Sequence, residues 1–242
     1  MSQTRGVHEP GIAEHLESVR RRIAQAAERS GRDPAAVRLI AVTKTVAPER
    51  IAEALAAGVT DLGENRVQEA LRKHPSVPLG PRWHLIGHLQ SNKAGLAAGL
   101  FDTVHSLDSA RVATALSTHR DAGREPITGL VEVDFTGIPG RTGVAAGAAE
   151  AVAHACSDLP GVQLRGLMTI APFGDLEAAR GCFRRLGALR DRLQERLGLA
   201  LPELSMGMSD DFELAVEEGA TMVRLGRVVF GDRPRPPLPP SE

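Results

Sequence analysis

Only three lysines occur in the chain, Lys44, Lys73 and Lys93, and one of them stands where an amine is costly to bury. Lys44 directly follows residues 37–43, the first run with the apolar pattern of a buried strand. In a dry pocket a lysine can lose its proton and attack a carbonyl carbon to form an imine, which arginine cannot do. Alternatively, its aliphatic stem packs on the core while the ammonium group reaches water. The position alone leaves both interpretations open.

A second kind of chemistry is indicated near the C-terminus, where two glycine-containing segments follow predicted strands. Ser205 opens the run Ser-Met-Gly-Met-Ser-Asp-Asp, and Gly226 and Arg227 follow the run Met-Val-Arg-Leu. A hydroxyl, backbone N–H groups that glycine leaves accessible and a guanidinium together suit a phosphate. Acidic residues at the start of the next helix would repel an anion, so we interpret them as helix caps and dipole partners. Glycine turns beside a surface arginine are the alternative.

Two further polar side chains lie within apolar runs. Period-two alternation places Arg224 on the same strand face as Met222, and this face points either to the surface or into a site. His84 is equally ambiguous, because a lone histidine on a strand is commonly a hydrogen-bonded structural group. His84 and His88 would share a strand face, but without a third ligand the sequence predicts no metal site.

Composition narrows the functional class. The chain has 242 residues, 42% of them hydrophobic, and a net charge of −1, so neither disorder nor a basic nucleic-acid-binding face is indicated. Cys156 and Cys182 lie in helical patterns without partners at metal-site spacing, which is typical of a cytosolic protein. The chain has neither a signal-peptide pattern nor an apolar run of about 18 residues, so we expect a cytoplasmic protein without membrane contact.

Short apolar runs alternate with helical patterns along the chain. The eight predicted strands are 38–43, 59–62, 83–87, 103–106, 129–135, 164–170, 203–205 and 222–225. The predicted helices are 12–29, 48–57, 67–73, 92–98, 109–119, 145–157, 176–197 and 211–218. Eight strand–helix units predict an α/β fold, a single (β/α)8 TIM barrel over residues 1–232 with an extra N-terminal helix. A doubly wound open sheet is the rival, because strand count alone does not close a barrel. Residues 233–242 are proline-rich and are predicted to form a loose tail.

In a barrel the functional residues lie at the carboxyl ends of the strands. Lys44, Asn65, the segment that begins at Ser205 and the turn at Gly226 all fall at such ends. An imine-forming lysine after the first strand and a phosphate turn after the last two strands suit pyridoxal 5′-phosphate on a barrel.

At this point the sequence resembles the pyridoxal phosphate homeostasis proteins (the YggS/PROSC type). The matching segments are 41–45, 63–69, 83–93, 165–168, 204–211 and 223–231. They span nearly the whole chain in the order that the family has, so the match is specific.

The resemblance implies a fold like the barrel domain of alanine racemase and pyridoxal 5′-phosphate held as a covalent aldimine at Lys44. It also implies phosphate contacts from Ser205 and the turn at Gly226, and an arginine, Arg224, that faces the pyridine nitrogen. A fixed cation beside that nitrogen keeps it unprotonated, which makes the ring a weaker electron sink. The cofactor-binding residues implied by the resemblance are Lys44, Asn65, His84, Ser205, Arg224, Gly226 and Arg227.

The sequence departs from the common family pattern at three positions. Arg66 stands where tyrosine is frequent, and Arg227 stands where serine or threonine is common. Arg141 stands where some members carry lysine. We therefore expect no second imine site at this position, because arginine does not form one readily.

Three functions compete on these features. A non-catalytic carrier would hold the cofactor, limit its free concentration and hand it to apoenzymes. An amino-acid racemase would need a proton donor on each face of the cofactor. The barrel racemases use a tyrosine from a second domain as one donor, and this chain contains no tyrosine. A sugar-phosphate enzyme would explain the phosphate turn but not Lys44, unless Lys44 were an aldolase lysine. We expect the carrier without robust catalysis, as a monomer because the racemases' second domain is missing, with PLP-dependent apoenzymes as candidate partners.

Overall fold

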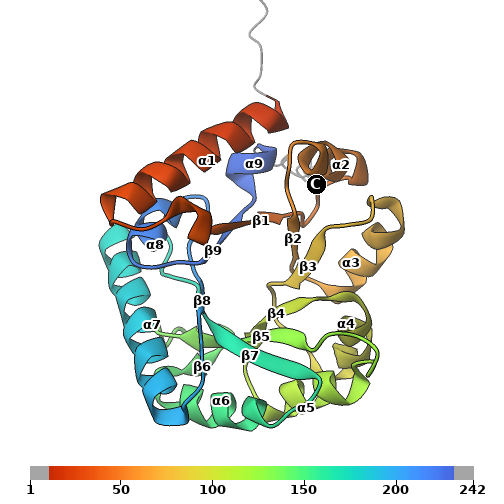
Figure 1. Cartoon of the computed structure of the whole chain (residues 1–242), viewed down its shortest axis with the longest axis vertical. Coiled ribbons are helices and arrows are strands. Elements are labelled where there is room, and N and C mark those ends of the chain that lie inside the picture. The colour runs from red at the N-terminus through yellow and green to blue at the C-terminus, as the bar shows by residue number, and fades with distance from the viewer. Residues whose placement is uncertain (1–10, 232–242) are drawn as a thin grey trace, which may run out of the picture.

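The predicted apolar runs form eight parallel strands that close into a barrel in the computed structural model, which describes residues 11–231 (Figure 1). The barrel strands are β1 (Arg38–Val42), β2 (Asp61–Glu64), β3 (Arg82–Leu85), β4 (Thr103–Leu107), β5 (Ile127–Asp134), β7 (Val162–Met168), β8 (Glu203–Ser205) and β9 (Met222–Leu225). A two-residue strand, β6 (Val144–Ala145), pairs with β5 alone. Because β1 pairs with β9 and β4 pairs with β5, the ring has no edge, which confirms the barrel and rules out the open sheet.

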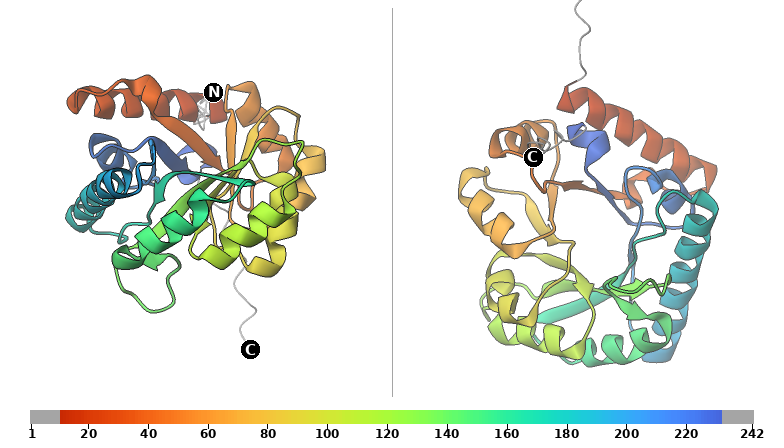
Figure 2. Two further views of the ribbon diagram at one scale, coloured as in Figure 1. Left: turned by 60° about the horizontal axis from the view of Figure 1, so that its bottom comes forward. Right: turned by 180° about the vertical axis from the view of Figure 1, so that it is seen from behind.

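Helices surround this barrel and cover its outer face (Figure 2). They are α1 (Ile12–Arg29), α2 (Pro48–Ala56), α3 (Val67–Lys73), α4 (Ala94–Leu100), α5 (Ala110–His119), α6 (Ala149–Ser157), α7 (Leu176–Leu197), α8 (Phe212–Glu217) and α9 (Arg227–Phe230). Short 3-10 turns are η1 (Pro34–Ala36), η2 (His74–Ser76), η3 (Ser91–Lys93) and η4 (Ala146–Ala148). The longest described helix, α7, is capped by Asp175, whose carboxylate accepts the N–H of Ala178, and is followed by Gly198 in the left-handed conformation (φ 65°).

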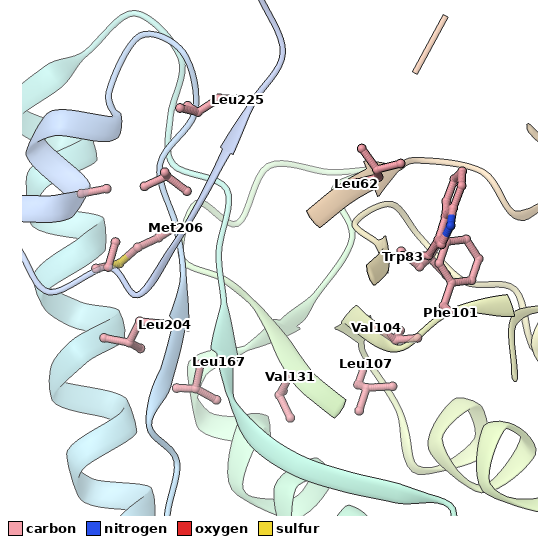
Figure 3. Close-up of a cluster of buried hydrophobic side chains, with 14 of the residues drawn as sticks. Leu62, Trp83, Phe101, Val104, Leu107, Val131, Leu167, Leu204, Met206 and Leu225 are labelled. Atoms are coloured by element: carbon pink, nitrogen blue, oxygen red, sulfur yellow. The ribbon is translucent and has the colours of Figure 1, made fainter. Parts of the chain in front are cut away.

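Two apolar layers hold the barrel together. The outward-facing residues of the strands pack under the helices, and Leu62, Trp83, Val104, Leu167 and Leu204 belong to this layer (Figure 3). The inner layer is much smaller and contains four buried apolar side chains, Ile40, Leu130, Met168 and Met222. Polar side chains occupy much of the remaining interior, and this makes the inside of the barrel the place to look for function.

The predicted boundaries differ from the structure in a few places. Strand β2 covers Asp61–Glu64 rather than residues 59–62. Gly63 and Glu64 therefore belong to the strand and not to the following loop. The predicted helix 145–157 begins only at Ala149, after β6 and a 3-10 turn. The short helix α9 was not predicted, because four residues are too few to show a periodicity. The predicted tail 233–242 lies outside the described residues. Within residues 11–231, every helix is too short or too polar to cross a membrane.

Candidate functional site

Three neighbouring strands bring together residues that are 160 or more positions apart in the sequence. Strand β9 lies between β1 and β8, with Ile40 paired to Arg224 and Met222 paired to Ser205. Lys44 follows the carboxyl end of β1, and Gly226 follows that of β9. The structure therefore gathers the predicted amine and the predicted phosphate turn on one side of the same rim.

Lys44 lies, half-buried, in the turn after β1, and the backbone on both sides of it is held by helix α3. The N–H of Thr45 donates to Glu69 Oε1 (2.6 Å), which stabilises an unfavourable positive φ of 63° at Thr45. On the other side, Lys73 Nζ donates to the carbonyl of Thr43 (2.6 Å). Tertiary contacts thus fix the direction in which Lys44 leaves the strand.

The same lysine of α3 neutralises two carboxylates beneath this turn. Lys73 Nζ lies 2.8 Å from Glu64 Oε1 and 2.6 Å from Glu69 Oε1. Glu64 is fully buried, and burial raises its pKa against the opposing effect of hydrogen bonds from Lys73 and Thr43. Its second oxygen, Oε2, is the one buried side-chain N or O atom among the described residues without a hydrogen-bond partner. This cluster was not predicted, although Glu69 and Lys73 stand at the i, i+4 spacing of a helical ion pair.

Arg224 points into the barrel, which settles the ambiguity that alternation left. Its side chain is 4% exposed, with Nη1 donating to Ser205 Oγ (2.7 Å) and Nη2 to the carbonyl of Thr169 (2.9 Å). Burial lowers the pKa of Arg224 to about 10, while the carboxylates of Asp211 and Glu132 act in the opposite direction. The guanidinium is therefore a fixed cation at neutral pH.

Ser205 and His84 lie below the rim rather than at it. The Ser205 hydroxyl is fully buried between His105 Nδ1 (2.7 Å) and the guanidinium of Arg224. Both ring nitrogens of His84 also have protein partners, Asp61 Oδ1 (2.9 Å) and His105 Nε2 (2.9 Å). A direct contact of either side chain with a ligand stays a prediction; what the structure gives them is a link to Arg224.

The predicted phosphate turn lies at the start of α9, beside the loop before α8. Gly226 is the N-cap residue of α9, and the first N–H groups of a helix have no partner within the helix. Arg227 Nη2 lies 2.5 Å and 2.6 Å from the two carboxylate oxygens of Asp210. Half-buried Ser209 precedes Asp210, and its hydroxyl makes no hydrogen bond to another described residue. Ser209 thus offers a hydroxyl at the rim, where Ser205, four positions earlier in the same run, was predicted to bind the phosphate.

The acidic residues around this turn have local partners, but the expected capping hydrogen bond is absent, because the Asp211 side chain accepts from no N–H group of α8. Asp211 is the N-cap residue of α8, and its Oδ1 accepts the N–H of Met208 (2.6 Å). Glu213, in the first turn of α8, forms a two-pronged pair with Arg22 of α1 (3.1 Å for both contacts). These two carboxylates therefore have partners away from the N-terminus of α9, whereas Asp210 pairs with Arg227, the first residue of that helix.

Asn65 lies half-buried directly after β2, at the same rim. The end of β3 passes close to its backbone at Gly87, where a Cβ atom would lie 2.4 Å from the carbonyl oxygen of Asn65. Any side chain at position 87 would therefore push these two loops apart. The glycine keeps Asn65 near the barrel opening, and its contact with a ligand stays a prediction.

The other departures from the family pattern lie around the rim. Arg66 is exposed and is the N-cap residue of α3. Arg141, in the loop after β5, is half-buried and donates to the carbonyl of Ile170 (2.9 Å) beyond the end of β7. Arg141 therefore joins two rim loops through a hydrogen bond, in the place where a lysine would offer an amine.

Two other features of the described residues do not form competing sites. A cavity of about 780 Å³ opens at the amino-terminal end of the barrel, but its arginines are engaged. Arg38 and Arg82 pair with Glu203 and Asp61, each at 3.0 Å, and Arg20 donates to the carbonyls of Ala57 and Gly58. His88 pairs with Asp108 (3.2 Å) and does not approach a shared ligand with His84. No group of three or more His, Cys, Asp or Glu side chains within residues 11–231 is placed to hold a metal ion.

The buried carboxylate of Asp61 predicts a specific pH dependence of stability. Burial raises its pKa, but hydrogen bonds from His84, Thr60 and Arg82 outweigh this and lower it from 3.8 to about 2. Because the folded-state pKa is the lower one, its contribution of about 2 kcal/mol is complete above pH 4 and is lost as the pH falls towards 2. We expect Asp61→Asn to flatten the urea-unfolding free energy over that range. Parallel curves for variant and wild type would contradict this assignment.

Known proteins are similar to this chain in both sequence and fold. The sequence matches the family model of the alanine racemase N-terminal domain over residues 15–234. A pyridoxal phosphate homeostasis protein of Pseudomonas aeruginosa is 45% identical over 224 residues, which are 92% of this chain and 96% of that protein. The Escherichia coli protein of the same name is 39% identical over 231 residues, with 92% and 97% coverage.

Among solved structures, PipY of Synechococcus elongatus with PLP bound is 40% identical and has a TM-score of 0.78, covering 91% of this chain and 100% of that one. The same protein without PLP has a TM-score of 0.80. An alanine racemase of Clostridium difficile, 14% identical with a TM-score of 0.70, shares the fold; the match covers 91% of this chain and 57% of the racemase.

Proposed function

Because this chain belongs to the family of the pyridoxal phosphate homeostasis proteins, we propose that it binds pyridoxal 5′-phosphate (PLP) and serves vitamin B6 homeostasis. One observation carries the proposal. The turn with Lys44 and the turn with Gly226 follow adjacent parallel strands, β1 and β9, at the same rim. An amine and an anion site side by side are what an aldehyde with a phosphate tail requires.

The chemistry of the donor set fits PLP. The cofactor supplies an aldehyde that condenses with an amine, and a pyridine ring that accepts electrons. Lys44 would hold the aldehyde carbon covalently through its amine. The N–H groups at Gly226, the Ser209 hydroxyl and the charge of Arg227 bind the phosphate. Asp210 already pairs with Arg227 and screens part of its charge, so backbone N–H groups carry more of this interaction.

Arg224 would face the ring nitrogen in this arrangement and would determine how reactive the bound cofactor is. A guanidinium only donates hydrogen bonds, so it satisfies an unprotonated nitrogen and opposes its protonation. The ring is then a weak electron sink, which disfavours the removal of a proton from a bound amino acid. The site is therefore suited to storing the cofactor rather than to using it.

The racemase alternative also lacks a second proton donor. The chain contains no tyrosine, and His84, a residue type that can transfer protons, has both ring nitrogens occupied by Asp61 and His105. We propose that the protein is a non-catalytic carrier. Its monomeric state and the transfer of PLP to apoenzymes stay predictions.

The proposed cytoplasmic location is supported by the state of the cysteines. Cys156 and Cys182 are both free and buried, and burial raises the pKa of Cys156 to about 11. Such thiols are unreactive, and a protein that keeps them reduced is typical of a reducing compartment.

Binding and turnover can be tested on the wild-type protein. We expect titration of the apoprotein with PLP to produce a visible absorption band that borohydride converts into a stable adduct. We also expect negligible racemisation of alanine, serine or lysine by the loaded protein. A turnover near the ~10 s⁻¹ of a typical enzyme would contradict the carrier assignment. Failure to bind PLP would contradict the whole proposal.

A further inference from the structure

An unbroken chain of buried side chains runs through the barrel interior from Arg224 to Asp61. Arg224 Nη1 contacts Ser205 Oγ (2.7 Å), and Ser205 Oγ contacts His105 Nδ1 (2.7 Å). His105 Nε2 then contacts His84 Nδ1 (2.9 Å), and His84 Nε2 contacts Asp61 Oδ1 (2.9 Å). The four residues below Arg224 are fully buried, and they come from β8, β4, β3 and β2. The chain thus spans the barrel and uses both nitrogens of both rings.

The two ends of this chain dictate the direction of every hydrogen bond within it. At one end Arg224 can only donate. At the other end Asp61 is ionised and can only accept, because Arg82 donates to it (3.0 Å) as does Thr60 (2.6 Å). Burial lowers the pKa of both histidines, so each ring is neutral, with one donor and one acceptor nitrogen.

One assignment satisfies all five groups. His84 carries its proton on Nε2 and donates to Asp61, so its Nδ1 accepts from His105 Nε2–H. His105 Nδ1 then accepts from the hydroxyl of Ser205. With its own proton committed in this direction, the Ser205 oxygen presents its lone pairs to Arg224.

The opposite direction of these hydrogen bonds is disfavoured for two reasons. It would require a protonated Asp61 beside the guanidinium of Arg82. It would also leave the Ser205 proton without an acceptor, because the only partners of this hydroxyl among the described residues are His105 and Arg224. A buried hydroxyl without an acceptor costs about as much as a lost hydrogen bond.

We propose that His84 and His105 are positioning residues for Arg224. Through Ser205 they present an acceptor at one terminal nitrogen of the guanidinium, and the Thr169 carbonyl holds the other, so the plane of the group is fixed. The inference deepens the proposed function, since it rests on Arg224 facing the ring nitrogen of PLP. It gives His84, a predicted ligand-contacting residue, a role exerted at a distance.

The direction of the chain can be tested without any ligand. We expect nitrogen NMR of apoprotein labelled at histidine to show His84 and His105 as neutral rings with the proton on Nε2. Among the eight histidines, the signals of His84 and His105 are assigned as those that vanish in His84→Gln and His105→Gln. A proton on Nδ1 of either ring, or a doubly protonated ring at pH 7, would overturn the proposal. Because PLP takes no part, this result is independent of whether the protein binds it.

The positioning role is tested through PLP affinity and its rescue. His105→Leu removes both the donor and the acceptor, and we expect PLP to bind at least about 10-fold more weakly. His105→Gln retains an amide donor and acceptor and should recover most of the affinity. The control is Ser106→Ala, on the same strand as His105. It removes a hydrogen bond from the buried Ser106 hydroxyl to the Gly87 carbonyl (2.7 Å), and the PLP affinity of this variant should stay within about 2-fold of wild type.

A second variant, which breaks the hydrogen-bond chain at another residue, controls for a folding defect in the first. Ser205→Ala deletes one oxygen and should weaken PLP binding by a similar factor, with unfolding monitored for every variant. Wild-type affinity in folded Ser205→Ala or His105→Leu would overturn the positioning role. If instead wild-type protein fails to bind PLP while the ring protons lie as expected, the proposed function is wrong and the hydrogen-bond direction stands.

Discussion

Replacing Lys44 by arginine will abolish covalent attachment of PLP while the barrel stays folded. Arginine keeps the positive charge and the aliphatic stem, but it does not form an imine under these conditions. The backbone around position 44 is held by Thr43, Thr45 and their partners in α3, which the substitution leaves in place. The expected result is the loss of the visible band, with the far-ultraviolet dichroism unchanged.

The low lysine content makes the site of modification easy to identify, because Lys73 and Lys93 are the only other lysines. Lys93→Arg is the matched control, the same exchange at a second half-buried lysine, and it should retain the full adduct. Borohydride reduction followed by peptide mass mapping should locate the modification on Lys44 alone. A full-strength adduct in Lys44→Arg would refute the assignment of the amine.

Replacing Lys73 by methionine will lower the free energy of unfolding by about 3–5 kcal/mol, a range typical of removing one partner from a buried ion pair. Lys73 is 11% exposed, and the carboxylates that it neutralises, Glu64 and Glu69, are 0% and 17% exposed. Methionine fills a similar volume but leaves a buried carboxylate, Glu64, without its cation. Urea unfolding of the apoprotein at pH 7 measures the effect.

A double variant separates charge from packing. Glu64→Gln removes the stranded charge while keeping an acceptor for the Thr43 hydroxyl, so Lys73→Met/Glu64→Gln should recover part of the lost stability. Lys93→Met, for which no ion pair is found among the described residues, should cost less than about 0.5 kcal/mol. A loss below about 1 kcal/mol in Lys73→Met would show that this cluster does not stabilise the turn that carries Lys44.

Local chemistry in the sequence was sufficient for most of the elements. Helix α7 has the predicted bounds, because Asp175 caps one end and Gly198 supplies a left-handed residue at the other. Strands β8 and β9 also lie where the apolar runs predicted them. The carboxyl-end position of Lys44 and of the Gly226 turn follows from the strand order along the chain, once the strands are parallel.

What alternation could not supply was the direction in which each strand face points. Both faces of a barrel strand are buried. Alternation therefore places Met222 and Arg224 on one face of β9, but it does not say whether that face points into the barrel or towards the helices. For the same reason His105, in a five-residue strand that is buried throughout, gave no sign that it lies inside. Ser205 was expected at the rim, and the structure puts its hydroxyl among internal partners because β8 ends only at that residue.

The sequence by itself determined the components of the site. They are a lysine after the first strand, a glycine turn after the last strand, and an arginine on the strand that leads into that turn. Tertiary structure alone decided that these parts meet. The ring joins its first strand, β1, directly to its last, β9, and no local pattern encodes a pairing between segments 184 positions apart, such as Ile40 and Arg224. The chain of hydrogen bonds behind Arg224 likewise draws on four strands, so it exists only once the barrel has closed.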